Sequence, residues 1–164
     1  MPPREMKQGA FIRENFKTIW PVHLEGFTQL LIQLRDRFDG DLDLVLVLAV
    51  IGSRTQPERW SPALTELGKM TRVNGREGTQ LAINVQSVAD FSGIPRETVR
   101  RKVNALQDRG WVTRTADGRL GVTRIAAEEL QGATGNTIAY LSSLLMAFEQ
   151  ARASDPDRSH LQDL

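Results

Sequence analysis

The stretch that decides the fold is FSGIPRETVRRKV, which runs from Phe91 to Val103. Gly93 allows the positive φ that a tight turn needs, and Pro95 suits the first position of a helix. Val99 and Val103 keep helical spacing, with polar residues between them. The stretch therefore predicts a turn and then a helix, from Pro95 to Arg109, that buries one side and exposes a basic one.

Helical patterns precede this turn. Asn84 is expected to cap a short helix from Val85 to Phe91. Further upstream, Leu42 to Ile51 is apolar on nearly every side, which predicts a buried central helix that Asp41 or Asp43 caps and Gly52 ends. Residues 53–80 hold several prolines and glycines and are expected to form a long connection, with a short strand at 81–83.

A hairpin pattern follows the basic helix. Gly110 is expected to end that helix, and residues 111–115 and 120–123 then alternate around Asp117-Gly118. This dipeptide is typical of a two-residue β-turn between paired strands. The predicted elements follow the order of a winged helix-turn-helix. That order is a buried helix, a connection, a short helix, a turn, a basic helix and a hairpin.

Amphipathic helices flank this region on both sides. Residues 10–20 predict one helix, and the stripe from Leu24 to Phe38 predicts a second. Pro21 is expected either to end the first helix or to start the next one. After a brief helix at 125–130, the sequence GATGN is expected to interrupt the chain before a last helix from Thr137 to Ala151. The predicted fold class is mainly α with a small β-hairpin wing, divided into an N-terminal helical arm (1–40), a winged helix-turn-helix domain (41–124) and a C-terminal helical region for dimerisation (125–164).

Charge is unevenly distributed along the chain. Residues 96–124 carry eight arginine and lysine side chains but three acidic ones, whereas the rest of the chain has a net charge of −4. A basic island in an otherwise acidic chain is expected where a protein binds a polyanion. Double-stranded DNA is the polyanion that this fold accommodates, because its major groove admits one α-helix.

The outer face of the basic helix carries the candidate DNA contacts. Arginine can pair with guanine, glutamate can accept from cytosine and asparagine can bind adenine. The residues expected to contact bases are Arg96, Glu97, Arg100, Arg101 and Asn104. Those expected to contact phosphates are Gln86, Ser87, Thr98, Arg114 and Arg119, the last two beside the tip of the wing.

The run VQSVADFSGIPRETVRRKVNALQDRGWV, from Val85 to Val112, resembles the helix-turn-helix of the catabolite activator protein superfamily. The resemblance implies base contacts at Arg96, Glu97 and Arg101, and phosphate contacts at Gln86 and Thr98. Here the sequence departs from the pattern of that family at Arg100, where a small residue is usual. Nothing upstream resembles the cyclic-nucleotide barrel of the family.

The layout, a winged domain between helical arms, resembles the multiple-antibiotic-resistance (MarR-type) regulators, in which such helices form a dimer. We therefore expect a prokaryotic, sequence-specific transcriptional regulator that binds a palindromic operator as a homodimer. For a small-molecule effector of unknown identity, the expected place is near Trp20, Phe27 and Phe38, between the arms and the winged domain. The alternatives are a winged-helix protein-interaction module in a chromosome-organising or replication complex, and an ordinary solvated helix with an ion pair between Glu97 and Arg101.

The composition argues against other classes of function. The chain has no cysteine, which excludes disulfides and thiolate zinc sites. His23 and His160 lie far apart in the sequence and have no matching carboxylates. We therefore expect no metal site, no cofactor and no enzymatic activity. The apolar run from Leu44 to Ile51 is far shorter than the ~20 residues of a membrane span. A cytoplasmic, nucleoid-associated protein is the expectation.

Overall fold

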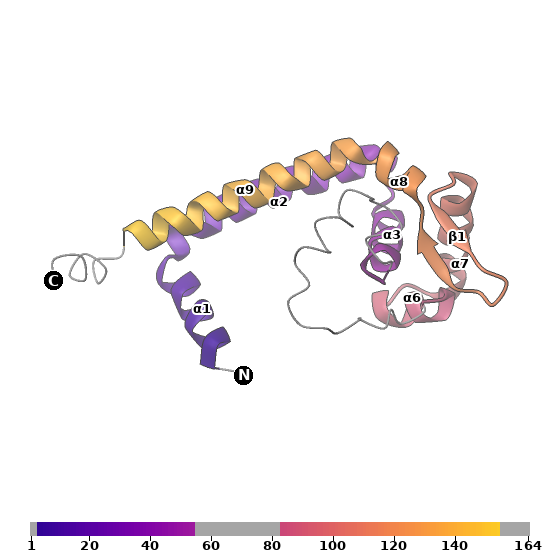
Figure 1. The fold of residues 1–164 in the computed structure, drawn as a ribbon, viewed down its shortest axis with the longest axis horizontal. Helices are drawn as coiled ribbons and strands as arrows, with labels where there is room; N and C mark the ends of the chain where they lie inside the picture. The colour runs from indigo at the N-terminus through magenta and orange to yellow at the C-terminus, as the bar shows by residue number, and fades with distance from the viewer. Residues whose placement is uncertain (1–2, 55–82, 155–164) are drawn as a thin grey trace, which may run out of the picture. The chain divides into compact units, whose positions relative to one another are not determined.

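The structure is a computed structural model that describes residues 3–54 and 83–154 (Figure 1). The chain divides into two compact units, residues 1–33 with 133–164, and residues 34–132. The predicted class, mainly α with a β-hairpin wing, is confirmed. The elements are α1 (Pro3–Glu14), α2 (Phe16–Arg37), α3 (Leu42–Arg54), α6 (Val85–Ser92), α7 (Arg96–Asp108), β1 (Val112–Arg114), β2 (Leu120–Val122), α8 (Arg124–Glu129) and α9 (Gln131–Ala153).

Helix α3 is the centre of the second unit, as its apolar composition predicted. Val47 and Ile51 are fully buried, and α3 packs against α6, α7 and β2. Asp41 caps it, since Oδ1 accepts a hydrogen bond of 2.9 Å from the Leu44 N–H. The prediction that Gly52 ends this helix is wrong, because α3 continues to Arg54. One glycine costs a helix about 1 kcal/mol, which is less than burial of a neighbouring isoleucine contributes.

The hairpin forms, but its turn differs from the predicted one. β1 and β2 pair antiparallel, with Val112 opposite Val122 and Arg114 opposite Leu120. The Thr115 N–H donates to the Arg119 carbonyl at 2.9 Å, which leaves a three-residue loop at 116–118 instead of a two-residue turn. Gly118 ends this loop with a φ of 84°, the left-handed conformation that follows a type I turn in such hairpins.

Most of the predicted connection at 53–80, and residues 81 and 82 of the predicted strand, lie outside the described residues. Ile83 is described and is buried. Its carbonyl accepts a hydrogen bond of 2.8 Å from the Leu120 N–H. The chain therefore enters α6 from a backbone contact with the wing strand β2.

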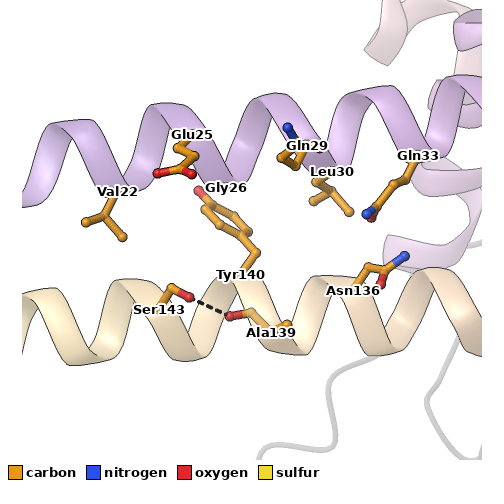
Figure 2. A pocket seen from close by; sticks show the side chains of 10 residues that line it. All are labelled: Val22, Glu25, Gly26, Gln29, Leu30, Gln33, Asn136, Ala139, Tyr140 and Ser143. Atoms are coloured by element: carbon orange, nitrogen blue, oxygen red, sulfur yellow. Dashed lines mark hydrogen bonds between the residues drawn. The ribbon is translucent and has the colours of Figure 1, made fainter.

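In the first unit, α2 and α9 lie side by side and run in opposite directions (Figure 1). Tyr140 of α9 lies against Gly26 of α2, where a Cβ atom would collide with the ring (Figure 2). The Tyr140 hydroxyl is 2.7 Å from His23 Nδ1. The glycine therefore allows the close approach that brings these two polar groups into contact.

Two predicted helix breaks are absent from this pair. Pro21 was expected to end one helix or to start the next, yet it lies inside α2, and the junction between α1 and α2 falls at Asn15 instead. The loss of one backbone hydrogen bond at a proline is offset here by a row of stacked rings, Phe16 on Trp20 and His23 on Phe27. The GATGN interruption is also wrong, because α9 runs through Gly132 and Gly135.

Candidate nucleic-acid interface

The turn between α6 and α7 has the predicted geometry. Asn84 Oδ1 accepts from the Ser87 N–H at 2.9 Å and caps α6. Gly93 ends that helix with a φ of 74°, and its N–H donates to the Ala89 carbonyl. Helix α7 then begins after Pro95, which occupies the N-cap position and not the first helical one. The capped ends of α6 and one glycine therefore set the direction in which α7 leaves the turn.

Helix α7 is divided into a buried and an exposed side. Val99, Val103 and Leu106 are fully buried among residues of α3, α6 and the wing. The predicted base-contacting side chains point away from this core. Those that are exposed are Arg96, Glu97, Arg100, Arg101 and Asn104, while Thr98 is half-buried. The structure thus brings all five onto one outward surface, which we call the α7 outer face.

Ion pairs neutralise much of the basic island. Within the described part of the chain, Arg96, Arg101 and Arg114 have no acidic partner. The paired cations are Arg100 with Glu97, Lys102 with Asp41, Arg109 with Asp39, Arg119 with Asp117, and Arg124 with Glu128. The free positive charge is therefore concentrated on the α7 outer face and on β1 of the wing.

The strongest pair on the α7 outer face joins Glu97 to Arg100. Arg100 Nε and Nη2 donate to the two carboxylate oxygens at 2.9 Å and 2.6 Å. The hydrogen bond from Arg100, together with the charges of Arg101 and Arg96, holds the pKa of the Glu97 carboxyl below its ordinary value of 4.5. Glu97 in turn raises the pKa of Arg100. Both side chains are therefore charged at neutral pH.

The wing tip carries a second pair. Arg119 Nε donates to Asp117 Oδ2 at 2.8 Å, and the Thr115 hydroxyl donates to the same carboxylate. The Thr115 hydroxyl and the Arg119 charge together hold the pKa of Asp117 below its ordinary value of 3.8. Arg114 lies on β1, is exposed, and has no such partner among the described residues. Of the two wing arginines, Arg114 offers the less compensated charge.

The two predicted phosphate contacts on α6 already have hydrogen-bond partners. Gln86 is exposed, and its Nε2 donates to Asp90 Oδ1 at 2.7 Å. Ser87 is half-buried, and both its N–H and its hydroxyl donate to Asn84 Oδ1. The second N–H of Gln86 Nε2 is not used by Asp90, whereas the Ser87 hydroxyl would have to rotate away from Asn84 before it could donate to a phosphate.

Two cations of α7 and its end bind acidic side chains from distant parts of the chain, and the sequence did not predict these pairs. Lys102 was counted with the basic island, yet its Nζ binds Asp41, 61 residues earlier. Arg109 binds Asp39 at 3.4 Å and stacks on Trp111. No local pattern indicates pairs at such separations. The Glu97 pair was expected with Arg101, four residues on, whereas the structure pairs Glu97 with Arg100, three residues on.

The rings expected near an effector belong to two different units. In the first unit Phe27 stacks on His23, and the Trp20 ring contacts His23 at a tilt of 51°. Phe38 belongs to the core of the second unit, where it contacts Trp111 edge-on at 5.5 Å. A groove of about 350 Å³ between α2 and α9 is instead lined mainly by polar residues (Figure 2). His160 and Trp60 lie outside the described residues.

Comparison with protein families adds one finding. Residues 58–133 match the family described as the Crp-like helix-turn-helix domain. The match extends beyond the run from Val85 to Val112 on both sides and includes the wing and α8. Neither the curated proteins nor the solved structures gave a match. Among the helices that the structure describes, none is long and apolar enough to span a membrane.

Proposed function

We propose that the chain is a prokaryotic transcriptional regulator that recognises a specific DNA sequence. It carries a Crp-like helix-turn-helix domain, which supports a DNA-binding regulator in general terms. Helix α7 enters the major groove with its outer face toward the bases. The observation that carries this proposal is the pair of exposed arginines, Arg96 and Arg101, that lack an acidic partner in the described residues. Such arginines are available for guanine or phosphate.

The residues divide into two roles in this proposal. Base contacts come from the α7 outer face, and phosphate contacts come from the start of α6, from Thr98 and from the wing. Phosphate contacts position a protein on DNA, and base contacts give it specificity. The α6 side chains contribute to positioning, Ser87 after rotation of its hydroxyl, Arg114 contributes more than Arg119, and the protein acts in the cytoplasm on the nucleoid.

The proposed regulator is a homodimer, and an exposed apolar face of the first unit supports this. Along α2 the large side chains recur at steps of four, four, three and four residues, and along α9 at steps of three and four. Eight of them are between 39 % and 59 % exposed: Phe16, Trp20, Leu24, Phe27 and Leu31 on α2, and Ile138, Leu141 and Leu145 on α9. We call this set the apolar face.

The two stripes lie on the same side of the helix pair. With 3.6 residues per turn, the α2 stripe is adjacent to His23 and the α9 stripe is adjacent to Tyr140, and these two residues are in contact. Glu25, Gln29 and Ser143 line the groove between α2 and α9 (Figure 2). The same helical spacing places them on the other side of the pair. The apolar face is therefore continuous across both helices, with one polar contact, His23 with Tyr140, at its centre.

The size of the apolar face fits a second copy of the chain. If each of the eight half-exposed side chains is taken at about 150–250 Å², the range for large aromatic side chains, they leave roughly 600–1,000 Å² uncovered. A stable interface buries about 800 Å² per partner. A dimer with two-fold symmetry presents two α7 helices to DNA. The two half-sites of its palindromic operator then lie about 34–36 Å apart, one helical turn of DNA.

Gel-shift titration with two single variants tests the proposed function. On a duplex selected by the wild-type chain, Arg101→Ala is expected to lose about 1–3 kcal/mol of binding free energy and to relax the base preference. Arg114→Ala is expected to weaken binding to selected and unrelated duplexes equally and to reduce the salt slope by about 1. Arg119→Ala should have a smaller effect than Arg114→Ala, because Asp117 already neutralises Arg119.

Arg13→Ala, which removes an exposed arginine of α1, is the control and should bind as the wild type does. The protein-interaction alternative predicts that the wild type binds neither heparin nor random duplex DNA at low salt. That result, or unchanged affinity in both Arg101→Ala and Arg114→Ala, would contradict the assignment of α7 to the major groove.

A further inference from the structure

The pairing of Glu97 with Arg100 assigns separate roles to these two residues. Both lie on the α7 outer face, with 67 % and 51 % of their side chains exposed. Resting on the proposed function, we propose that Arg100 recognises a guanine, while Glu97 is a positioning residue that orients the Arg100 guanidinium and does not itself accept from cytosine.

The donors of Arg100 support this division. A guanidinium has five N–H donors, and Glu97 takes one from Nε and one from Nη2. The two donors of Nη1 and the second donor of Nη2 remain free, and one donor of each nitrogen lies side by side along the outer edge of the group. That edge has the two-donor geometry that binds O6 and N7 of guanine. The ion pair with Glu97 therefore leaves the base-recognising side of Arg100 open.

The acceptors of Glu97 favour the same division. Each carboxylate oxygen already accepts a hydrogen bond from a charged guanidinium, at 2.9 Å and 2.6 Å. Cytosine offers a neutral amino group, and a hydrogen bond from a neutral donor is weaker than one from a charged donor. Each oxygen keeps a second lone pair, but Arg100 orients the carboxylate, so a cytosine amino group would have to approach from the side that this ion pair leaves open.

The neighbouring arginines show what the pair adds. Arg96 and Arg101 carry the same charge on the same face but have no carboxylate that orients them among the described residues. An arginine that is already held in one orientation loses less conformational freedom when it binds. Arg100 is accordingly the arginine of the α7 outer face whose base preference depends on a second side chain.

Selection of bound duplexes from a random pool, with wild type, Arg100→Ala, Glu97→Gln and Arg100→Lys, tests the inference. The wild type is expected to select guanine at one position of each half-site. In Arg100→Ala the preference for guanine over the other bases should fall about 5- to 150-fold. A preference for cytosine should appear there instead, because the carboxylate of Glu97 is then free. Glu97→Gln should weaken the guanine preference several-fold without a change of base, and Arg100→Lys should lose it.

Arg124→Ala and Glu128→Gln are matched controls, since they disrupt an exposed Arg–Glu pair in α8 at a similar distance of 2.9 Å. Both should select the wild-type sequence, and the thermal unfolding of every variant should confirm that it is folded. The inference alone would be overturned if Arg100→Ala selected the same sequence as the wild type. It would also be overturned if the wild type selected a cytosine that Glu97→Gln alone no longer selects. A wild-type chain that selects no sequence would overturn the proposed function and the inference with it.

Discussion

Asp41 shows how one side chain can have two structural roles. Its carboxylate caps α3 at the Leu44 N–H and also binds Lys102 of α7. Partial burial raises the pKa of Asp41, but the hydrogen bonds from Lys102 and from the Leu44 N–H lower it by more than burial raises it. The pKa of Asp41 therefore lies below its ordinary value of 3.8. The sequence predicted the cap, with Asp43 as the other candidate. It did not predict the ion pair, because Lys102 carries no local mark of its distant partner.

Substitution of Asp41 separates the two roles. Asp41→Asn keeps a capping oxygen but loses the charge, whereas Asp41→Ala loses both and should be about 1 kcal/mol less stable than Asp41→Asn. Because folding lowers the pKa of Asp41, its charge stabilises the fold above the ordinary pKa, and this contribution is lost as the pH falls through the native pKa. The wild type should therefore exceed Asp41→Asn in unfolding free energy at about pH 7, with the difference shrinking toward about pH 2.

Urea unfolding across that pH range measures the difference, with Asp43→Asn as the control, since Asp43 is exposed at the same helix start. Asp43→Asn removes a carboxylate from the same helix start but leaves the ion pair between Asp41 and Lys102, so its unfolding free energy at about pH 7 should fall less than that of Asp41→Asn. A wild-type advantage over Asp41→Asn that grows as the pH falls would contradict the direction of the pKa shift.

At the scale of elements, glycines with different backbone conformations should respond oppositely to alanine. Gly93 ends α6 with a φ of 74°, and no atom lies within 4 Å of the place that a Cβ atom would occupy, so only backbone strain opposes a side chain there. Gly93→Ala should therefore cost about 1–2 kcal/mol of unfolding free energy. Gly135 lies inside α9 with equal space around it and no positive φ. Gly135→Ala should stabilise the chain by up to about 1 kcal/mol.

Thermal or urea unfolding of the two variants checks this pair of predictions, and each variant controls for the addition of a methyl group in the other. A loss of stability in Gly135→Ala similar to that in Gly93→Ala would mean that space, not backbone conformation, limits both positions. Gly26 differs from both, because a methyl group there would meet the Tyr140 ring.

The same glycines explain where prediction of the elements succeeded and failed. Gly93 lies between a capped helix and a proline, so local residues agree on a turn. Gly132 and Gly135 lie in GATGN, where local propensity favours a break. Helix α9 nevertheless continues through both glycines, each of which is exposed and has open space around it. Pro21 was misjudged for a local reason, since the rings of Phe16, Trp20 and His23 on either side of it contact one another within α2 and support the helix across the proline.

At the scale of the whole molecule, the apolar face should decide the oligomeric state. Leu141 and Met146 are both exposed on α9, at 55 % and 61 %. Leu141 belongs to the apolar face, whereas Met146 follows Ser143 at a three-residue step and lies on the side of the groove. Leu141→Glu is therefore expected to give a monomer with greatly weakened operator binding, and Met146→Glu is expected to behave as the wild type does.

Sedimentation equilibrium gives the oligomeric mass, and gel-shift titration with full and half operators gives the affinity. Binding of Leu141→Glu to a half operator should match that of the wild-type half-site, since α7 is unaffected. A dimeric mass for Leu141→Glu, or a monomeric one for the wild type, would exclude the apolar face as the dimer interface.

The sequence by itself determined the local features: the capped start of α6, the glycine turn, the buried side of α7 and the outward position of its five polar side chains. These follow from contacts within a few residues, which spacing alone reveals. Only the tertiary structure decided which charges remain free, because Asp41 and Asp39 reach α7 and its end from 61 and 70 residues away. It also decided that α2 and α9 remain unbroken through Pro21, Gly132 and Gly135, and that Gly26 lets Tyr140 approach α2 closely, because contacts between residues more than 100 positions apart leave no local pattern.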